Sequence, residues 1–357
     1  MTLAELRALW RAPRGQRLRQ GRGPMLPGVV LAWLAQRRRD RGYYDLLTLA
    51  LFRAAWQRNR SSRALLEYVL FRWDLGHGLP QRWIAPLLDG LIRLRPLQRR
   101  RALALVATAA PERLAAASHH LTKDAAQRMA PVAAWQRRRN SKTAAPWLAD
   151  LSEQQHHWRT RFAEYVHSCR DKGICLVGNA GSLTGAGQGM WIDGQGLVVR
   201  FNRYRNETSR DEDVGVRLQV WVAAPGYAGP MPLEAPWVVV TGPEMQVRRQ
   251  NWQPLRPRLE QGLPVLTAPL HIWRELVTQT CAPPSAGLLL LAWFRSILGG
   301  WEGISTVGLG VTPSSQLPYH HADPRQQPVS RHNWEAEREL LHRWHAQGLY
   351  VRELHHV

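Results

Sequence analysis

A glycine-rich stretch at residues 173–205 constrains the fold of this 357-residue chain more than any other part of it. It begins with a short apolar run at 174–177, which has the length of a buried strand. The run stops at a Gly-Asn-Ala-Gly turn, 178–181, and a second apolar run follows at 197–201. Glycine lets a backbone approach an anion closely because it has no Cβ. A strand that leads into such a turn is how α/β proteins bring backbone N–H groups to a phosphate.

The stretch does not match the standard nucleotide-binding motifs. The dinucleotide pattern G-x-G-x-x-G fails because Gly185 and Gly187 are followed by Met190 at the third glycine position. The P-loop pattern fails because Gly-Lys-Ser/Thr occurs nowhere in the chain. Taken alone, the stretch is compatible with a phosphate-binding turn and equally with a glycine-rich surface loop.

The net charge of +21 is concentrated in the N-terminal part of the chain. Residues 1–140 contain 27 Lys and Arg against 8 Asp and Glu, whereas the remainder contains 21 against 19. Such asymmetry suggests an anionic partner: nucleic acid, anionic lipid headgroups or an acidic glycan. The alternative is a general arginine bias, since only three of the 48 basic residues are lysines.

Cysteine content and hydropathy point to a cytosolic protein. The three cysteines, Cys169, Cys175 and Cys281, have no zinc-site spacing. The longest apolar runs, such as 28–35, are too short to span a bilayer. Arginines interrupt the N-terminal region where a signal peptide would be apolar. We expect a cytoplasmic protein, with contact to the inner membrane surface as an option that the basic charge leaves open.

The N-terminal part is predicted to be helical throughout. Apolar residues recur at three- and four-residue spacings in four segments: 43–58, 61–73, 81–94 and 97–109. No clean repeat period and no catalytic constellation is found in this part. A polar stretch around 137–143 precedes a predicted helix at about 148–169. We therefore predict a basic all-helical domain over 1–140, a linker and lead-in helix over 141–172, and an α/β domain over 173–357.

Strand and helix patterns alternate in the C-terminal half. Apolar runs predict strands at 174–177, 197–201, 218–223, 236–241, 263–267 and 304–309. Helical patterns at 271–279, 286–298 and 333–347 fall among the later strands. The continuously apolar run at 237–240 is typical of a strand buried on both faces. This alternation favours a largely parallel α/β sheet.

Three further sequence segments follow the glycine-rich stretch along the chain. Ser285, Ala286 and Gly287 open an apolar helix that leads to a strand ending near Gly308. A Tyr-His-His string at 319–321 comes next. Finally, a histidine at 332 precedes a glutamate by five residues. Together with the turn at 178–181, this set resembles the sialyltransferase family and its four sialylmotifs, L, S, III and VS.

On this resemblance, motif L would span residues 175–203, with the turn near its start and Asn202 near its end. Motif S would span 284–310, with Ser-Ala-Gly where the family usually has Ser-Thr-Gly. Motif III would centre on His320, and motif VS would run over 332–337. The resemblance covers about half of the chain.

The resemblance implies a Rossmann-like variant of the GT-A fold, a mostly parallel sheet flanked by helices, here preceded by an all-α domain. It implies an inverting, metal-independent glycosyltransferase that moves sialic acid, or a similar acid such as Kdo, from CMP to a hydroxyl of a cell-surface glycan or lipid oligosaccharide. Animal members join motifs L and S by a disulfide. Cys175 matches the motif L cysteine, but motif S has none at 296–299. This fits a reduced, bacterial-type member.

The implied roles agree with the chemistry of the residues. The donor-binding residues would be Gly178, Asn179, Ala180, Gly181, Asn202, Ser285, Ala286, Gly287, Gly308 and Glu337. N–H groups and amides at these positions could meet the charge that develops on departing CMP. By analogy His320 would hydrogen-bond the phosphate, and His332 would be the general base, because an imidazole that titrates near neutrality suits that role. Ser285 and Gly287 could also be no more than a helix cap.

Glu337 is expected to orient the motif VS segment. In one continuous helix, five residues place two side chains about 140° apart, so His332 and Glu337 would not share a face. We therefore expect His332 to lie at, or just before, the start of the helix.

One pattern favours a different chemistry. Residues 211–213 read Asp-Glu-Asp, and an Asp-x-Asp pair holds a divalent metal in many glycosyltransferases. It follows a polar stretch, so we predict a solvated loop there and no metal site.

Two other functions stay open at this point. The first is a nucleic-acid-binding or nucleotide-sensing protein, although the basic region shows no helix-turn-helix or aromatic RNA-binding motif. The second is a degenerate, inactive family member, which the presence of both His320 and His332 argues against.

Overall fold

A computed structural model describes residues 26–139, 145–249, 251–310, 319–323 and 325–352. Its centre is a seven-stranded sheet with the order β5-β4-β3-β2-β1-β6-β7, in which every neighbouring pair is parallel. The strands are β1 Ile174–Val177, β2 Leu197–Phe201, β3 Val220–Ala223, β4 Trp237–Val240, β5 Val265–Thr267, β6 Ile304–Val307 and β7 Tyr350–Val351. The predicted parallel α/β sheet is confirmed. The sequence did not predict β7, because two residues are too few for a periodic pattern.

The sheet is covered on both faces because side chains alternate along its strands. Ile174 and Leu176 of β1 belong to the main hydrophobic core, which includes α10 Gln155–Cys169 and α16 Ala286–Leu298. Cys175 and Val177 point to the other face and pack in a smaller cluster with residues of α11 Gly189–Asp193 and α12 Asp211–Val214. This is why the strands read as continuously apolar runs.

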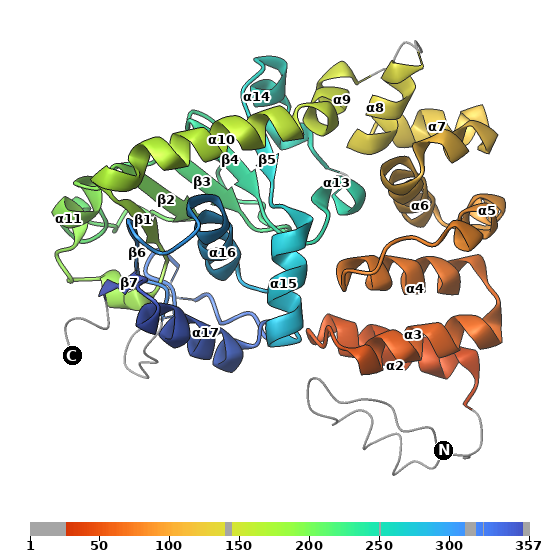
Figure 1. Ribbon diagram of the computed structural model, residues 1–357, viewed down its shortest axis with the longest axis horizontal. Helices are drawn as coiled ribbons and strands as arrows, with labels where there is room; N and C mark the ends of the chain where they lie inside the picture. The colour runs from red at the N-terminus through yellow and green to blue at the C-terminus, as the bar shows by residue number, and fades with distance from the viewer. Residues whose placement is uncertain (1–25, 140–144, 250, 311–318, 324, 353–357) are drawn as a thin grey trace.

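The remaining helices lie around the sheet and on one side of it (Figure 1). The N-terminal helices are α2 Gly28–Asp40, α3 Leu46–Asn59, α4 Ser62–Asp74, α5 Gln81–Asp89, α6 Pro96–Ala109, α7 His119–Ala126 and α8 Ala130–Arg138. The others are α9 Pro146–Glu153, α13 Met245–Arg248, α14 Arg256–Glu260, α15 Leu270–Thr280 and α17 Trp334–Ala346. Short 3-10 helices are η1 Leu91–Arg93, η2 Pro111–Ala116, η3 Arg170–Lys172, η4 Gly181–Leu183 and η5 Gln253–Leu255.

Two predicted helices are interrupted in the structure. The segment predicted at 81–94 ends as an α-helix at Asp89 and continues after Gly90 as η1. The lead-in helix predicted at 148–169 is two helices, α9 and α10, which meet at Gln154. The break accompanies a buried side chain, because the Gln155 amide turns back to donate to Leu151 O at 3.0 Å.

The same Gln155 amide covers the outer edge of β5. It donates to Val265 O at 2.7 Å and accepts from Thr267 N at 2.9 Å. The guanidinium of Arg159, one turn further along α10, donates to Thr267 O at 2.8 Å. The outward-facing backbone groups of β5 are thus bonded by side chains of α10.

The helical N-terminal part packs directly onto the α/β part. One hydrophobic core runs through both, from Leu31 to Val351. The backbone of Tyr44 donates to Cys281 O at 2.9 Å, and Arg274 donates to Trp73 O at 2.8 Å. The boundary predicted near residue 140 lies within 140–144, outside the described residues. Within the described ranges, no helix is long and apolar enough to cross a membrane.

A buried ion pair joins the two parts. The Asp74 side chain, at the end of α4, is 0% exposed, and it accepts from Arg248 of α13 through both carboxylate oxygens. Arg248 also donates to Leu70 O at 3.2 Å. The buried pair therefore fixes α4 against the first turns that follow β4.

We predict that Asp74→Ala lowers the free energy of unfolding by about 3–5 kcal/mol, because it leaves the Arg248 guanidinium buried without its counter-charge. Urea denaturation followed by tryptophan fluorescence measures this. Glu260→Ala, which removes the exposed Arg256–Glu260 pair, is the control and should lower the free energy of unfolding by about 1 kcal/mol or less. Equal effects of the two variants would show that the buried pair does not join the two parts.

Candidate active site

A cavity of about 610 Å³ lies in the α/β part at the carboxyl ends of β1, β2 and β6. The strand order reverses here, since β2 to β5 extend to one side of β1 and β6 and β7 to the other. Open α/β sheets bind ligands at such a switch point. The cavity is lined by every predicted site residue except Glu337: Gly178, Asn179, Ala180, Gly181, Asn202, Ser285, Ala286, Gly287, Gly308, His320 and His332.

The turns after β1 and β6 touch at two glycines. A Cβ on Gly178 would lie 1.9 Å from Gly308 O, so no other residue fits there without a backbone shift. Gly308 itself has φ +70°, which favours glycine. Ala180 N donates to Gly308 O at 2.9 Å, so this N–H is already bonded within the protein. Of the N–H groups expected to meet a phosphate, those of Asn179 and Gly181 have no partner in the described part of the chain.

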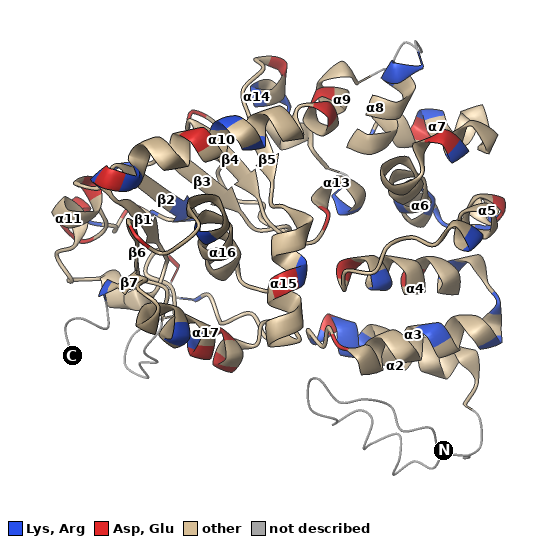
Figure 2. Cartoon of the chain, in the orientation of Figure 1, with Lys and Arg blue, Asp and Glu red and all other residues tan. Residues whose placement is uncertain are grey.

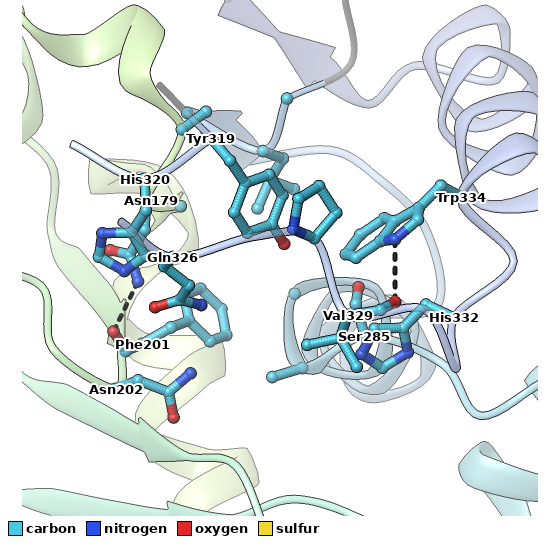
Figure 3. Close-up of a pocket in the computed structure, with 18 of the residues that line it drawn as sticks. Asn179, Phe201, Asn202, Ser285, Tyr319, His320, Gln326, Val329, His332 and Trp334 are labelled. Carbon is cyan, nitrogen blue, oxygen red and sulfur yellow. Dashed lines mark hydrogen bonds between the residues drawn. The ribbon is translucent and has the colours of Figure 1, made fainter. Parts of the chain in front are cut away.

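Two asparagines line the side of the cavity nearest β2 (Figure 3). Asn179 donates through Nδ2 to Phe201 O at 2.9 Å, while its Oδ1 is buried and has no hydrogen-bond partner among the described residues. Asn202 has φ +48° and accepts from Ala224 N through Oδ1 at 2.8 Å, which leaves Nδ2 as its second polar group. Asn202 Nδ2 can therefore donate to a ligand, whereas the Asn179 acceptor Oδ1 has almost no accessible surface.

His320 is fixed as a hydrogen-bond donor. Its Nδ1 accepts from Ala322 N at 3.1 Å, so the proton of the neutral ring is on Nε2. Burial lowers the pKa of His320, and the ring is therefore neutral at pH 7. The next residue, His321, donates from its backbone to Asn179 O at 2.8 Å and so ties this segment to the turn after β1.

His332 is fixed in the opposite tautomer. Helix α17 begins at Trp334 with Asn333 as its N-cap, so His332 lies just before the helix, as the spacing argument predicts. Its Nδ1 is 2.8 Å from Pro283 O, and because a carbonyl only accepts, Nδ1 carries the proton. Burial lowers the pKa of His332. The neutral ring then has its basic lone pair on Nε2.

Glu337 holds two elements of the site together without lining the cavity. Its Oε1 accepts from Ser285 N at 2.8 Å, at the start of α16, and lies 3.9 Å from His332 Nδ1. The Glu337 side chain is buried, and burial raises its pKa to about 7 although the hydrogen bond to Ser285 opposes this. The orienting role predicted for Glu337 agrees with this position, whereas direct donor contact does not.

Ser285 is the N-cap of α16. Its Oγ accepts from Leu288 N at 3.2 Å. The cap interpretation is therefore confirmed for Ser285, and a ligand contact would have to use the remaining capacity of the same hydroxyl.

The Asp-Glu-Asp sequence is not the solvated loop predicted for it. Residues 211–214 form the short helix α12, and Asp213 is buried. The Asp213 carboxylate accepts from Gly185 N at 2.9 Å and from Gly187 N at 3.0 Å, and these bonds lower its pKa. Asp213 therefore fixes the backbone of the glycine-rich loop, and Asp211 is paired with Arg205.

Some lining residues were not predicted as site residues. Tyr319 and Trp334 pack with ring centroids 5.9 Å apart, and His332 packs edge-on against Trp334 at 5.0 Å. Arg338 lies one helical turn after Trp334 and also lines the cavity. The signal in the sequence was proximity to His320 for Tyr319, and to His332 for Trp334 and Arg338. Proximity to His332 does not say which side of α17 faces the cavity.

No protein-family model matches the chain, and comparison with curated proteins gives no match. Two solved structures are similar to it in fold, both of mammalian sialyltransferases. One has a TM-score of 0.38, and the other, in complex with Gal-beta-1-3GalNAc-ortho-nitrophenol, has a TM-score of 0.36. Each has 15% sequence identity and covers 57% of this chain and 83% of the other. Function has to be inferred from the cavity itself.

We predict that Glu337→Gln stabilises the protein increasingly as the pH rises from about 4.5 to about 7. The folded pKa of about 7 lies above the ordinary value of 4.5, so the folded state binds more protons between these values and loses stability as pH rises through them. Glutamine keeps an acceptor for Ser285 N–H but does not titrate.

Urea denaturation at several pH values tests this. The stability gain of Glu337→Gln should be absent near pH 4.5 and complete above about pH 7. Glu339→Gln, at an exposed position of the same helix, should show no such trend. A gain that does not depend on pH would contradict the burial of a carboxylate at 337.

Proposed function

We propose that this chain is a glycosyltransferase of the sialyltransferase type. It would transfer sialic acid, or a similar acidic sugar such as Kdo, from CMP to a hydroxyl of a glycan or glycolipid, with inversion. The observation that carries the proposal is the pair of histidines in one cavity. Backbone groups hold His320 with a proton on Nε2 and His332 with a lone pair on Nε2.

The two tautomers supply the two groups that such a reaction needs: a base for the attacking hydroxyl and a hydrogen-bond donor for the departing phosphate. The bond between the anomeric carbon and the CMP phosphate breaks, and the acceptor oxygen forms a new bond to the same carbon. His332 Nε2 would take the proton of the acceptor hydroxyl. His320 Nε2–H would donate to the departing phosphate, whose charge grows as the bond breaks.

The placement of the histidines also supports inversion. An inverting displacement requires the attacking and departing oxygens on opposite sides of the anomeric carbon. His320 and His332 lie on opposite sides of the cavity (Figure 3). Asn179 and Asn202 lie on the His320 side, where the nucleotide would bind, and the N-terminus of α16 lies near His332.

The neutral groups of the cavity suit a reaction without a metal ion. The backbone N–H groups of the turn after β1, the Asn202 amide and the His320 imidazole would stabilise the departing phosphate by themselves. We propose that catalysis persists in the presence of EDTA.

We predict that the protein binds CMP more tightly than UDP or GDP in the presence of EDTA, and that it turns over CMP-sialic acid or CMP-Kdo. Calorimetry measures the first and release of CMP the second. His332→Ala should lower kcat about 10²- to 10⁴-fold without changing CMP affinity, because it removes only the base. His342→Ala, at an exposed position of α17, is the control.

The pH profile offers a second readout on the same variants. Since burial lowers the pKa of His332, activity should fall on acidification only below pH 6.5, as the base becomes protonated. Equal affinity for the three nucleotides, or full activity in His332→Ala, would overturn the proposed function.

We also propose that the basic helical part rests on an anionic membrane surface on the cytoplasmic side. Lys and Arg recur along helices α2 to α8 (Figure 2). On the outer face of α2, Trp33 is 52% and Val29 66% exposed, with the Arg37 guanidinium 5.5 Å from the Trp33 ring. A tryptophan with neighbouring arginines suits the headgroup region of a bilayer.

Vesicle flotation of the full chain tests the membrane proposal. We predict binding to vesicles that contain phosphatidylglycerol, weakening as salt increases, and little binding to phosphatidylcholine alone. Trp33→Ser should reduce binding, whereas Trp191→Ser, in the α/β part, should not. Equal binding to both lipids would contradict an electrostatic contact.

A further inference from the structure

The described wall of the cavity has one permanent charge and no counter-charge. Arg338 is the only Lys or Arg among the described residues that line it, and none of these is Asp or Glu. His320 and His332 are neutral at pH 7 because burial lowers the pKa of each. A ligand that fills this cavity therefore meets a net positive side chain.

Arg338 has no partner for this charge within the described part of the chain. Its neighbour Glu337 is directed to Ser285 N, and no hydrogen bond or ion pair of the Arg338 guanidinium is found among the described residues. Many other arginines of the chain are paired, as in Arg39–Glu67 and Arg137–Asp150. Arg338 is half-buried and lines the cavity, so its guanidinium is available to pair with an anionic group of a ligand.

The position of Arg338 separates it from the phosphate end of the cavity. It lies four residues after Trp334 on α17, and residues at this spacing share a helix face. Trp334 packs against His332 with ring centroids 5.0 Å apart. Trp334 and His332 lie opposite the asparagines and His320 (Figure 3). Arg338 lines the cavity one turn after Trp334, so we infer that it belongs to the side where the sugar and the acceptor would meet the base.

We propose that Arg338 is the specificity residue that binds a carboxylate of an acidic sugar in this cavity. The inference rests on the proposed function and names the group that the site selects. A guanidinium presents a planar pair of N–H donors that matches a carboxylate in a bidentate arrangement. The carboxylate can belong to the transferred sugar or to an acidic sugar of the acceptor, and the two sources share the same chemistry.

The experiment compares Arg338→Gln and Arg338→Lys with the unchanged enzyme and with Arg343→Gln, an exposed arginine of the same helix. Calorimetry measures the affinity for CMP, which has no carboxylate, and for CMP-sialic acid. Steady-state kinetics measures KM for one neutral acceptor and for one acceptor that ends in an acidic sugar.

We expect Arg338→Gln to bind CMP normally. If the carboxylate is on the donor, affinity for CMP-sialic acid falls about 10- to 100-fold; if it is on the acceptor, only KM for the acidic acceptor rises by this factor. The affected affinity or KM of Arg338→Lys should lie between the values for the unchanged enzyme and for Arg338→Gln, because lysine keeps the charge but loses the bidentate geometry. Arg343→Gln should have the same affinities and KM values as the unchanged enzyme.

Two outcomes overturn the inference while leaving the proposed function intact. Arg338→Gln with unchanged affinities and KM values would show that no carboxylate binds there. Weakened binding of CMP itself would show that the guanidinium meets the phosphate instead. If the unchanged enzyme does not bind CMP, the proposed function fails and this inference fails with it.

Discussion

The contact between Gly178 and Gly308 is the constraint on which the whole site depends. It brings the turns after β1 and β6 together at the point where the strand order reverses, and Ala180 N–H then bonds to Gly308 O. Because the two turns meet so closely, the residues that follow each of them line one cavity. The glycines here serve backbone-to-backbone packing first, and only the neighbouring N–H groups remain for a ligand. A glycine-rich turn can thus be sterically required without itself bonding an anion.

The second constraint is the way in which polar groups of the protein fix the catalytic candidates. Pro283 O sets the tautomer of His332, and Ala322 N sets that of His320. Glu337 keeps the start of α16 next to the segment that precedes α17. Pro283 O and Ala322 N lie outside the reacting groups, yet they determine which ring nitrogen can give or take a proton. The chemistry of the cavity therefore depends on a shell of backbone carbonyl and amide groups.

Much of the α/β part could be predicted from the sequence, because strands buried on both faces leave continuous apolar runs and a helix such as α16 has a clear cap. The site residues could be chosen from motif order, and the position of His332 from the angle between residues five apart. The break between α9 and α10 could not be foreseen, because it accompanies contacts of Gln155 with a strand 110 residues away. The role of Asp213 was missed, and so was the contact of Glu337 with Ser285 N, since only the fold shows which backbone N–H groups a carboxylate reaches.

The cover that α10 provides over β5 has a consequence for how the protein behaves among its copies. A parallel sheet whose last strand shows free N–H and C=O groups can add a strand from another chain, which is a route to aggregation. Here Gln155 and Arg159 bond the outward groups of Val265 and Thr267. At this edge the sheet cannot be extended unless α10 leaves it, and α10 is fixed by the core through Phe162. Two side chains of one helix thus prevent a strand of another chain from pairing with β5.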